Sequence, residues 1–175
     1  MNLSSDLILT HPLWEKAQDD LINRLGIFNR LIDLFLIACS IGIRDDKQIN
    51  SDDIDTPLSQ PRSIGRNTYL SAINTDLSDL LNLMLQNSIL TSKCLNMDLD
   101  ERLKLSFNPD YENKKFSPAN FLIGFANYGI VEIFDHINCD LPATTVSDDL
   151  YAYLNTLRDN DYEDLINTIT LDDLI

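Results

Sequence analysis

His136 and Cys139 are the residues whose types and spacing come closest to a metal site. Three positions apart, they can share one face of a helix, and imidazole and thiolate are ligands that zinc prefers. Zinc needs two more ligands, and the chain has no second pair of such residues at a suitable spacing. A cysteine nucleophile with His11 or His136 as its base is formally possible, but neither histidine has a recognisable catalytic context. We therefore predict no metal, cofactor or catalytic site.

Carboxylates are abundant, and spaced carboxylates can hold the metal ion of a phosphoryl-transfer enzyme. Here they occur largely as neighbours, at Asp45-Asp46, Asp52-Asp53, Asp148-Asp149 and Asp172-Asp173. Adjacent residues do not form a set of spaced ligands, so we interpret these pairs as solvating charge. The chain also lacks a Gly-rich phosphate-binding loop and a G-x-S-x-G nucleophile elbow. A non-enzymatic protein is the prediction, although a small enzyme whose site is assembled from distant residues stays open.

The charge balance indicates the kind of partner. The 175 residues include 28 Asp and Glu against 13 Lys and Arg, a net charge of −15. Such a surface repels nucleic acid and anionic lipid, so we expect a larger protein with a basic surface and no direct nucleic-acid or membrane binding. Nine acidic residues and one basic residue lie from Asp140 onward. The predicted partner contacts are Asp148, Asp149, Asp159, Asp161, Glu163, Asp164, Arg44 and Lys47.

The elements that must position these residues are helices. Between Leu31 and Ile41 only Asp33 and Ser40 are polar, so a helix here is apolar around nearly its whole circumference. This predicts a buried central helix with Asn29 as its cap and Gly42 at its end. An amphipathic helix precedes it, with Thr10 or His11 as cap, Pro12 in the first turn and Gly26 as its end. Trp14 lies on the apolar stripe of that helix, so we expect it to pack in the core.

A second strongly apolar helix begins at Ser117-Pro118, a cap followed by proline. Gly124 and Gly129 lie inside it, and they either allow a close helix crossing or, at Gly129, mark a break; the crossing is the simpler explanation. Helical spacing also predicts one bent helix or two helices from Thr68 to Leu85, with Thr75 or Ser78 restarting the second. Asp98–Phe107 is weakly helical and ends in a turn at residues 108–110, and Ser147 can cap the first of two short helices in the tail.

The segment from residue 43 to 66 is the least regular interior part of the chain. It is rich in Asp, Asn and Ser, so we expect a solvated loop with local ion pairs, in which a small β-hairpin is possible. A phosphate-binding role for its Arg and Lys residues is conceivable, but the interleaved Asp residues neutralise their charge. The predicted fold is mainly α: one compact helical domain of about six to eight helices around the central helix.

We expect residues 1–140 to form the helical core domain and residues 141–175 an acidic helical segment packed on or beside it. The three cysteines are scattered, which is typical of a reducing compartment. The first residues lack the features of a signal peptide, and the run Leu31–Ile43 is shorter than the ~20 residues of a membrane-spanning helix. These features predict a cytoplasmic protein.

Three short segments carry a resemblance to a known family: Gly26-Ile27-Phe28, Asp33–Ala38, and Ile41-Gly42-Ile43 with the polar loop that follows. Together they resemble the opening of small accessory proteins associated with bacterial DNA phosphorothioation (dnd) systems. Phe125–Ile130 resembles, in altered order, the Tyr/Ala/Asn/Gly turn near the end of those proteins. The resemblance covers about residues 24–135. It implies an accessory component of a phage-defence or DNA-modification operon without catalytic activity of its own.

Two functions follow from these observations. The first is a non-enzymatic accessory subunit that docks on a larger protein, and the alternative is an acidic DNA-mimic inhibitor that occupies the basic groove of a nuclease or DNA-binding protein. In both, we expect the acidic tail to contribute more to partner recognition than to the core. If the Leu and Tyr residues of the tail belong to the main core instead, its acidity is only the solvent-facing side of a structural helix.

Overall fold

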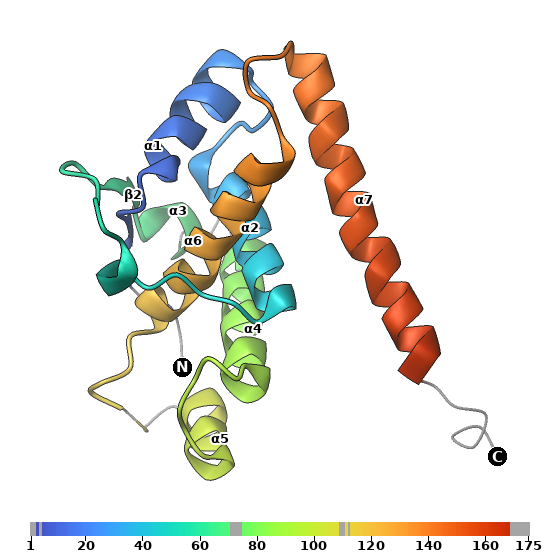
Figure 1. Cartoon of the computed structure of the whole chain (residues 1–175). Helices are drawn as coiled ribbons and strands as arrows, with labels where there is room; N and C mark the ends of the chain where they lie inside the picture. Colours follow the sequence, from blue (N-terminus) through green and yellow to red (C-terminus); the bar gives the residue numbers. More distant parts are fainter. Residues whose placement is uncertain (1–2, 4, 71–74, 109–110, 112, 169–175) are drawn as a thin grey trace. The chain divides into compact units, whose positions relative to one another are not determined.

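The computed structural model describes residues 3, 5–70, 75–108, 111 and 113–168, the last seven by their backbone only (Figure 1). Within these residues the chain forms seven α-helices, a π-helix, a short 3-10 helix and two short strands. The prediction of a mainly α fold with a small β element is therefore confirmed. The chain divides into two compact units, Met1–Glu132 and Ile133–Ile175.

The first unit is organised by a close crossing of α2 (Leu31–Asp45) and α6 (Pro118–His136). A Cβ atom added at Gly42 would collide with the backbone carbonyl of Phe125, and one added at Gly129 would collide with that of Ala38. Each helix thus supplies one glycine at the point where the other backbone passes. The close-crossing explanation of Gly129 is confirmed, because α6 continues unbroken through it.

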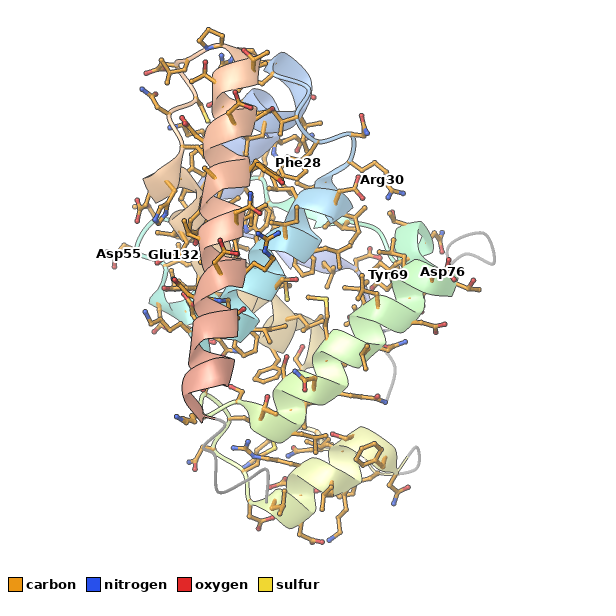
Figure 2. The ribbon with its side chains drawn as sticks, turned by 90° about the vertical axis from the view of Figure 1, so that its right-hand side faces the viewer. Phe28, Arg30, Asp55, Tyr69, Asp76 and Glu132 are labelled. Carbon is orange, nitrogen blue, oxygen red and sulfur yellow. The ribbon has the colours of Figure 1, made fainter. Side chains whose placement is uncertain are left out.

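Two predicted ends of α2 are wrong. The helix continues past Gly42 to Asp45 and ends at Asp46, which has the left-handed φ of 50° that Asp tolerates better than most residues. Gly42 is needed for the crossing instead. At the other end the cap position is Arg30, one residue after Asn29, and no side chain caps the helix there. Arg30 instead pairs with Asp33 of the first turn, at 2.6 Å (Figure 2).

Helix α6 is buried more completely than α2. Every residue from Phe121 to Asn127 is buried, whereas α2 leaves Ser40 exposed and several apolar residues half-buried. The additional cover comes from the segment that follows α2. The Ile49 N–H donates to the Gly124 carbonyl at 2.9 Å, and the Gln48 side chain donates to the Phe121 carbonyl at 3.0 Å. One stretch of irregular chain therefore covers the first half of α6.

Trp14 lies in the core, as predicted, and its indole N–H is a polar group that needs a hydrogen-bond partner there. It belongs to α1 (Leu13–Ala17), which continues into the π-helix η1 (Gln18–Arg24) and ends at Gly26 with a φ of 64°. The Trp14 indole N–H donates to the Asn127 side-chain oxygen at 2.9 Å, and the Asn127 amide donates to the Ile49 carbonyl at 3.0 Å. Asn127 is fully buried, so these two bonds satisfy a polar side chain inside the core.

The β element joins two distant segments. Strand β2 (Arg62–Ile64) comes from the 43–66 segment, and its antiparallel partner β1 (Leu7–Leu9) comes from the N-terminal segment, with Leu7 opposite Ile64. The same segment contains the 3-10 helix η2 (Ser51–Asp53). The 43–66 segment therefore supplies only one of the two strands, and the other comes from the N-terminal segment. Local turn signals in the sequence do not indicate such a distant pairing.

Helices α3 (Asn67–Leu70), α4 (Thr75–Thr91) and α5 (Leu99–Phe107) follow. The predicted bend and the turn after residue 108 fall partly on residues 71–74 and 109–110, which lie outside the described residues. Tyr69, labelled in Figure 2, is buried and donates its hydroxyl to the Ser5 carbonyl. The prediction of a helix over Asp98–Phe107 is confirmed, and the Asp98 side chain caps it by accepting from the Glu101 N–H at 2.8 Å.

Two predicted caps have different outcomes. At the start of α6, Ser117 accepts from the Asn120 N–H at 3.3 Å, which confirms it as the cap. In the second unit, Ser147 is not a cap, because it lies inside α7 (Ala143–Thr168), one continuous helix instead of two short ones. The helix starts directly after Pro142, whose carbonyl accepts from the Val146 N–H at 3.1 Å. The apolar spacing from Val146 to Leu157 runs without a break and supports one helix.

Candidate functional site

The exposed side of α7 is the strongest candidate for a functional surface. Asp148, Asp159 and Asp161 are exposed, and Tyr151 beside them is 68% exposed. Asp148 and Asp159 are eleven residues apart, about three turns, so they project from the same side of the helix. Asp149 is half-buried, and the side chains of Glu163 and Asp164 lie outside the described residues. We call Asp148, Tyr151 and Asp159, together with the exposed Asp161 near the end of the described helix, the α7 acidic surface.

The other side of α7 is apolar and buried. Val146, Leu150 and Tyr153 recur at intervals of four and three residues, and all three are buried. The ring of Tyr153 stacks on that of His136, with 3.9 Å between the ring centroids. At the next step of the pattern after the half-buried Leu157 stands Asp161, which is exposed. Among the described side chains the apolar stripe therefore ends at Leu157, and the exposed Asp161 lies on the line of that stripe.

One basic residue interrupts the acidity of this surface. The Arg158 guanidinium lies 3.0 Å from the Asp159 carboxylate, and both side chains are more than half exposed. An ion pair so open to solvent stabilises a protein by less than about 1 kcal/mol. Arg158 therefore offsets part of the negative charge of this surface and adds little to the stability of the helix.

The structure brings the predicted basic contacts, Arg44 and Lys47, together at the end of α2. Arg44 pairs with Asp45 at 2.7 Å. Lys47 donates to the hydroxyl of Tyr128 at 3.1 Å and lies 5.2 Å from the centre of its ring. Tyr128 in turn donates to the Asp45 carboxylate at 3.3 Å. Arg44 thus forms a local ion pair, as expected, and the contact of Lys47 with Tyr128 joins the end of α2 to α6.

Tyr128 is held in its neutral form by this cluster. Burial raises the pKa of its hydroxyl, and the carboxylates of Glu132 and Asp45 raise it further. A phenol that donates to carboxylates does not ionise near neutral pH. The cluster is therefore a hydrogen-bonded link between the two helices.

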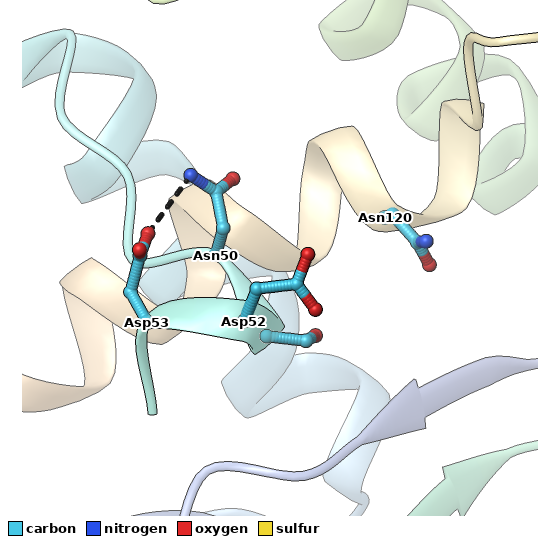
Figure 3. A pocket seen from close by; sticks show the side chains of 5 residues that line it. Asn50, Asp52, Asp53 and Asn120 are labelled. Atoms are coloured by element: carbon cyan, nitrogen blue, oxygen red, sulfur yellow. Dashed lines mark hydrogen bonds between the residues drawn. The ribbon is translucent and has the colours of Figure 1, made fainter. Parts of the chain in front are cut away.

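A polar hollow of about 330 Å³ opens beside the start of α6 (Figure 3). It is lined by Asn50, Ser51, Asp52, Asp53 and Asn120, all of them exposed. Oxygen atoms of this kind are the ligands of calcium and magnesium. Asp53 accepts from the Asn50 amide at 3.1 Å, which leaves Asp52 as the one carboxylate facing the hollow without that bond. No group of three His, Cys, Asp or Glu suited to a metal ion occurs in the described ranges.

The cysteine and histidine side chains considered as catalytic candidates have structural roles at Cys39 and His11. Cys39 is buried and donates to the Leu122 carbonyl at 3.6 Å, and burial raises the pKa of its thiol, so it packs as a small core residue. Burial lowers the pKa of His11, whose ring accepts from the Leu13 N–H at 3.3 Å. The prediction of Thr10 or His11 as the cap of α1 is wrong, because Pro12 occupies the cap position; the His11 ring only accepts a hydrogen bond from the first turn.

Sequence reasoning missed one surface. Leu99, Leu103 and Phe107 occupy consecutive turns of α5 and are 65%, 43% and 63% exposed. Their spacing of four residues was visible in the sequence, where it is the usual signal of a buried face. The structure buries Leu105 and Ser106 instead. We call Leu99, Leu103 and Phe107 the α5 stripe.

Comparisons of the chain with protein-family models, with curated proteins and with solved structures gave no match. Across the part of the chain that the structure describes, no helix is both long and apolar enough to cross a membrane.

Proposed function

We propose that this protein is a non-enzymatic accessory subunit of a bacterial phage-defence or DNA-modification system, and that it docks in the cytoplasm on a larger protein with a basic surface. The resemblance of residues 24–135 to dnd-associated proteins supports the biological setting. The α7 acidic surface supports the mode of docking.

The observation that carries the proposal is the two-sided character of α7. Val146, Leu150 and Tyr153 are buried, while Asp148 and Asp159 project on the opposite side. A helix anchored along one side presents its other side with little conformational freedom, so a partner does not have to order it on binding. The anchored carboxylates can therefore act as a preorganised contact.

Tyr151 adds an anchor to this contact. It is 68% exposed, the highest value among the large apolar and aromatic side chains that the structure describes. Tyrosine is enriched among the residues that contribute most to protein interfaces, because it buries a large ring and still satisfies its hydroxyl. A basic partner surface with an apolar pocket fits this arrangement.

The net charge of −15 also favours the alternative, a DNA-mimic inhibitor. Carboxylates along α7, a helix about 39 Å long, can occupy a groove built for phosphates. The two functions differ in their response to DNA. Duplex DNA should displace a mimic from its target, whereas an accessory subunit should remain bound.

The test is binding to each large protein encoded beside this gene, measured by calorimetry at low and high salt. The triple variant Asp148→Asn, Asp159→Asn, Asp161→Asn should bind about tenfold more weakly at low salt, and the difference should shrink as salt rises. The control Asp55→Asn, Asp76→Asn, Asp79→Asn removes the same charge from exposed positions outside α7. Equal weakening by both variants would contradict a specific role for α7.

A further inference from the structure

The N-terminal strap, which is Leu3 with residues 5–9, is bound by elements that lie far away in the sequence. The Leu3 N–H donates to the Asn82 side-chain oxygen of α4 at 3.0 Å. The Asp6 carboxylate accepts from the Arg66 N–H at 2.7 Å. Strand β1 lies within the strap and pairs with β2. These partners do not include α1, which directly follows the strap, so they stay in place if the connection to α1 opens.

The apolar residues of the strap belong to the core. Leu3, Leu7 and Leu9 are at most 1% exposed, whereas Ile8 is 44% exposed. Successive residues of a strand point to opposite sides, so Leu7 and Leu9 face the core and Ile8 faces solvent. Departure of the strap alone would expose these leucines to water. The strap is therefore expected to leave its site only when an equivalent segment takes its place.

The connection from the strap to α1 consists of Thr10, His11 and Pro12. The Thr10 hydroxyl oxygen is buried and, within the described ranges, has no hydrogen-bond partner. A buried hydroxyl without a partner costs free energy, which is recovered when water reaches it. The closed connection therefore carries a local cost that an open connection avoids.

We propose that the strap exchanges between two copies of this chain, so that each strap occupies the site on the other copy. The bonds to Asn82, Arg66 and β2 are then remade with the same residues, and the leucines stay buried, which makes exchange a low-cost route to a dimer. The opposing effect is charge, because each chain carries −15.

Salt screens the repulsion between the two chains, so the dimer should gain in stability as salt rises. This response is the opposite of the one expected for docking by α7. The strap and its site lie in the first unit, and the inference does not rest on the proposed function.

The test is disulfide cross-linking between two variants of the full chain. Ile8 and Ser63 are opposite each other in β1 and β2, and both are exposed. Opposite residues of an antiparallel pair are close enough for a disulfide. One chain carries Ile8→Cys and the other Ser63→Cys, both with Cys94→Ser, which removes the exposed native thiol. Mixed at about 0.5 mM protein and high salt and then oxidised, the two chains should form a covalent heterodimer.

A chain with Asn87→Cys replaces the Ser63→Cys chain in the control, because Asn87 is exposed on α4 and is not a pairing partner of β1. The yield of heterodimer should be at least about tenfold lower, since exchange does not bring these two thiols together. Equal yields would mean that chance collisions form the disulfide, and they would overturn the proposal. The absence of any heterodimer with Ser63→Cys would overturn it as well.

A lock on the strap provides an independent test. Ile8→Cys and Ser63→Cys in one chain, with Cys94→Ser, are oxidised at low protein concentration, so that the disulfide holds the strap in its own chain. Sedimentation at high protein concentration should show a dimer for the reduced form of this variant and only monomer for the oxidised form. A dimer that persists in the oxidised chain would be formed by another surface, and the proposal would be wrong.

Discussion

Helices α6 and α7 follow one another along the chain but are specified in opposite ways. The α6 helix carries no charged residue before Glu132, and seven consecutive residues, Phe121–Asn127, are buried. The α7 helix carries six acidic residues and one basic residue, and its buried stripe is one residue wide at each turn. In α6 the close approach of α2 limits the size of the side chain at positions such as Gly129. On the outer side of α7 the side chains are exposed, so their charge matters more than their size. The two helices should therefore differ sharply in their tolerance of substitution.

The largest effect is expected at the helix crossing. Gly129→Ala should lower the free energy of unfolding by about 3 kcal/mol or more, because its Cβ atom meets the Ala38 backbone, which cannot move unless the helices separate. The gain of about 1 kcal/mol in helix propensity offsets only part of this loss. Urea denaturation followed by circular dichroism measures the change.

Gly65→Ala is the matched control for that substitution. A Cβ atom added at Gly65 meets no atom within 4 Å, and its φ is not left-handed. The free energy of unfolding should therefore change by less than about 1 kcal/mol. Similar losses at Gly129 and Gly65 would show that the crossing is not the reason for glycine at position 129.

A smaller but still large effect is expected at the buried polar link of α6. Asn127→Ala should cost about 2–4 kcal/mol, because it leaves the Trp14 N–H and the Ile49 carbonyl without their partner in the core. In a Trp14→Phe background the cost should be smaller, since the unpaired indole N–H is gone. Thermal and urea denaturation of the two single variants and the double variant measure the coupling.

Asn87→Ala on α4 provides the comparison for Asn127, because Asn87 is exposed. It should change the free energy of unfolding by less than about 0.5 kcal/mol. If Asn127→Ala were equally mild, water would have to replace the lost bonds, and the link would not distinguish α6 from the surface helices.

The smallest effect is expected on the outer side of α7. Asp148→Asn and Asp159→Asn should each change the free energy of unfolding by less than about 0.5 kcal/mol, because both side chains are exposed and the pair of Asp159 with Arg158 is open to solvent. The same denaturation experiment measures it. A loss above about 1 kcal/mol would mean that these carboxylates serve the fold, and the contrast between α6 and α7 would fail.

The sequence predicted helices well where apolar spacing and a strong end signal agreed. Ser117 before Pro118 and Gly26 after the first helix are in the predicted roles. The wrong ends are those where neighbouring residues compete for one role. Asn29 lies one residue before the actual cap position, Gly42 lies three residues before the end of α2, and Ser147 lies inside α7. A local pattern supplies several candidates within one turn, and contacts from elsewhere in the chain choose among them.

At the candidate site, too, some features follow from the local sequence and others from contacts between distant segments. The sequence alone determined that the negative charge gathers in the tail and that an apolar stripe accompanies it, because charge and helical spacing are properties of the chain itself. Asp148, Asp159 and Asp161 are exposed for that reason. It did not determine that Lys47 is held against Tyr128 of α6, since Tyr128 is more than 80 residues away in the chain.

Only the tertiary structure decided which side of α5 faces out. By spacing alone, Leu99, Leu103 and Phe107 should form a buried face, yet all three are exposed and Leu105 is buried. The side of a short helix that becomes buried depends on how the helix is rotated against its neighbour. That rotation is set here by the bonds of Arg102 to the backbone carbonyls at the end of α4, and backbone carbonyls are the same in every sequence. The spacing of the stripe is present in the sequence, but its exposure depends on these tertiary contacts.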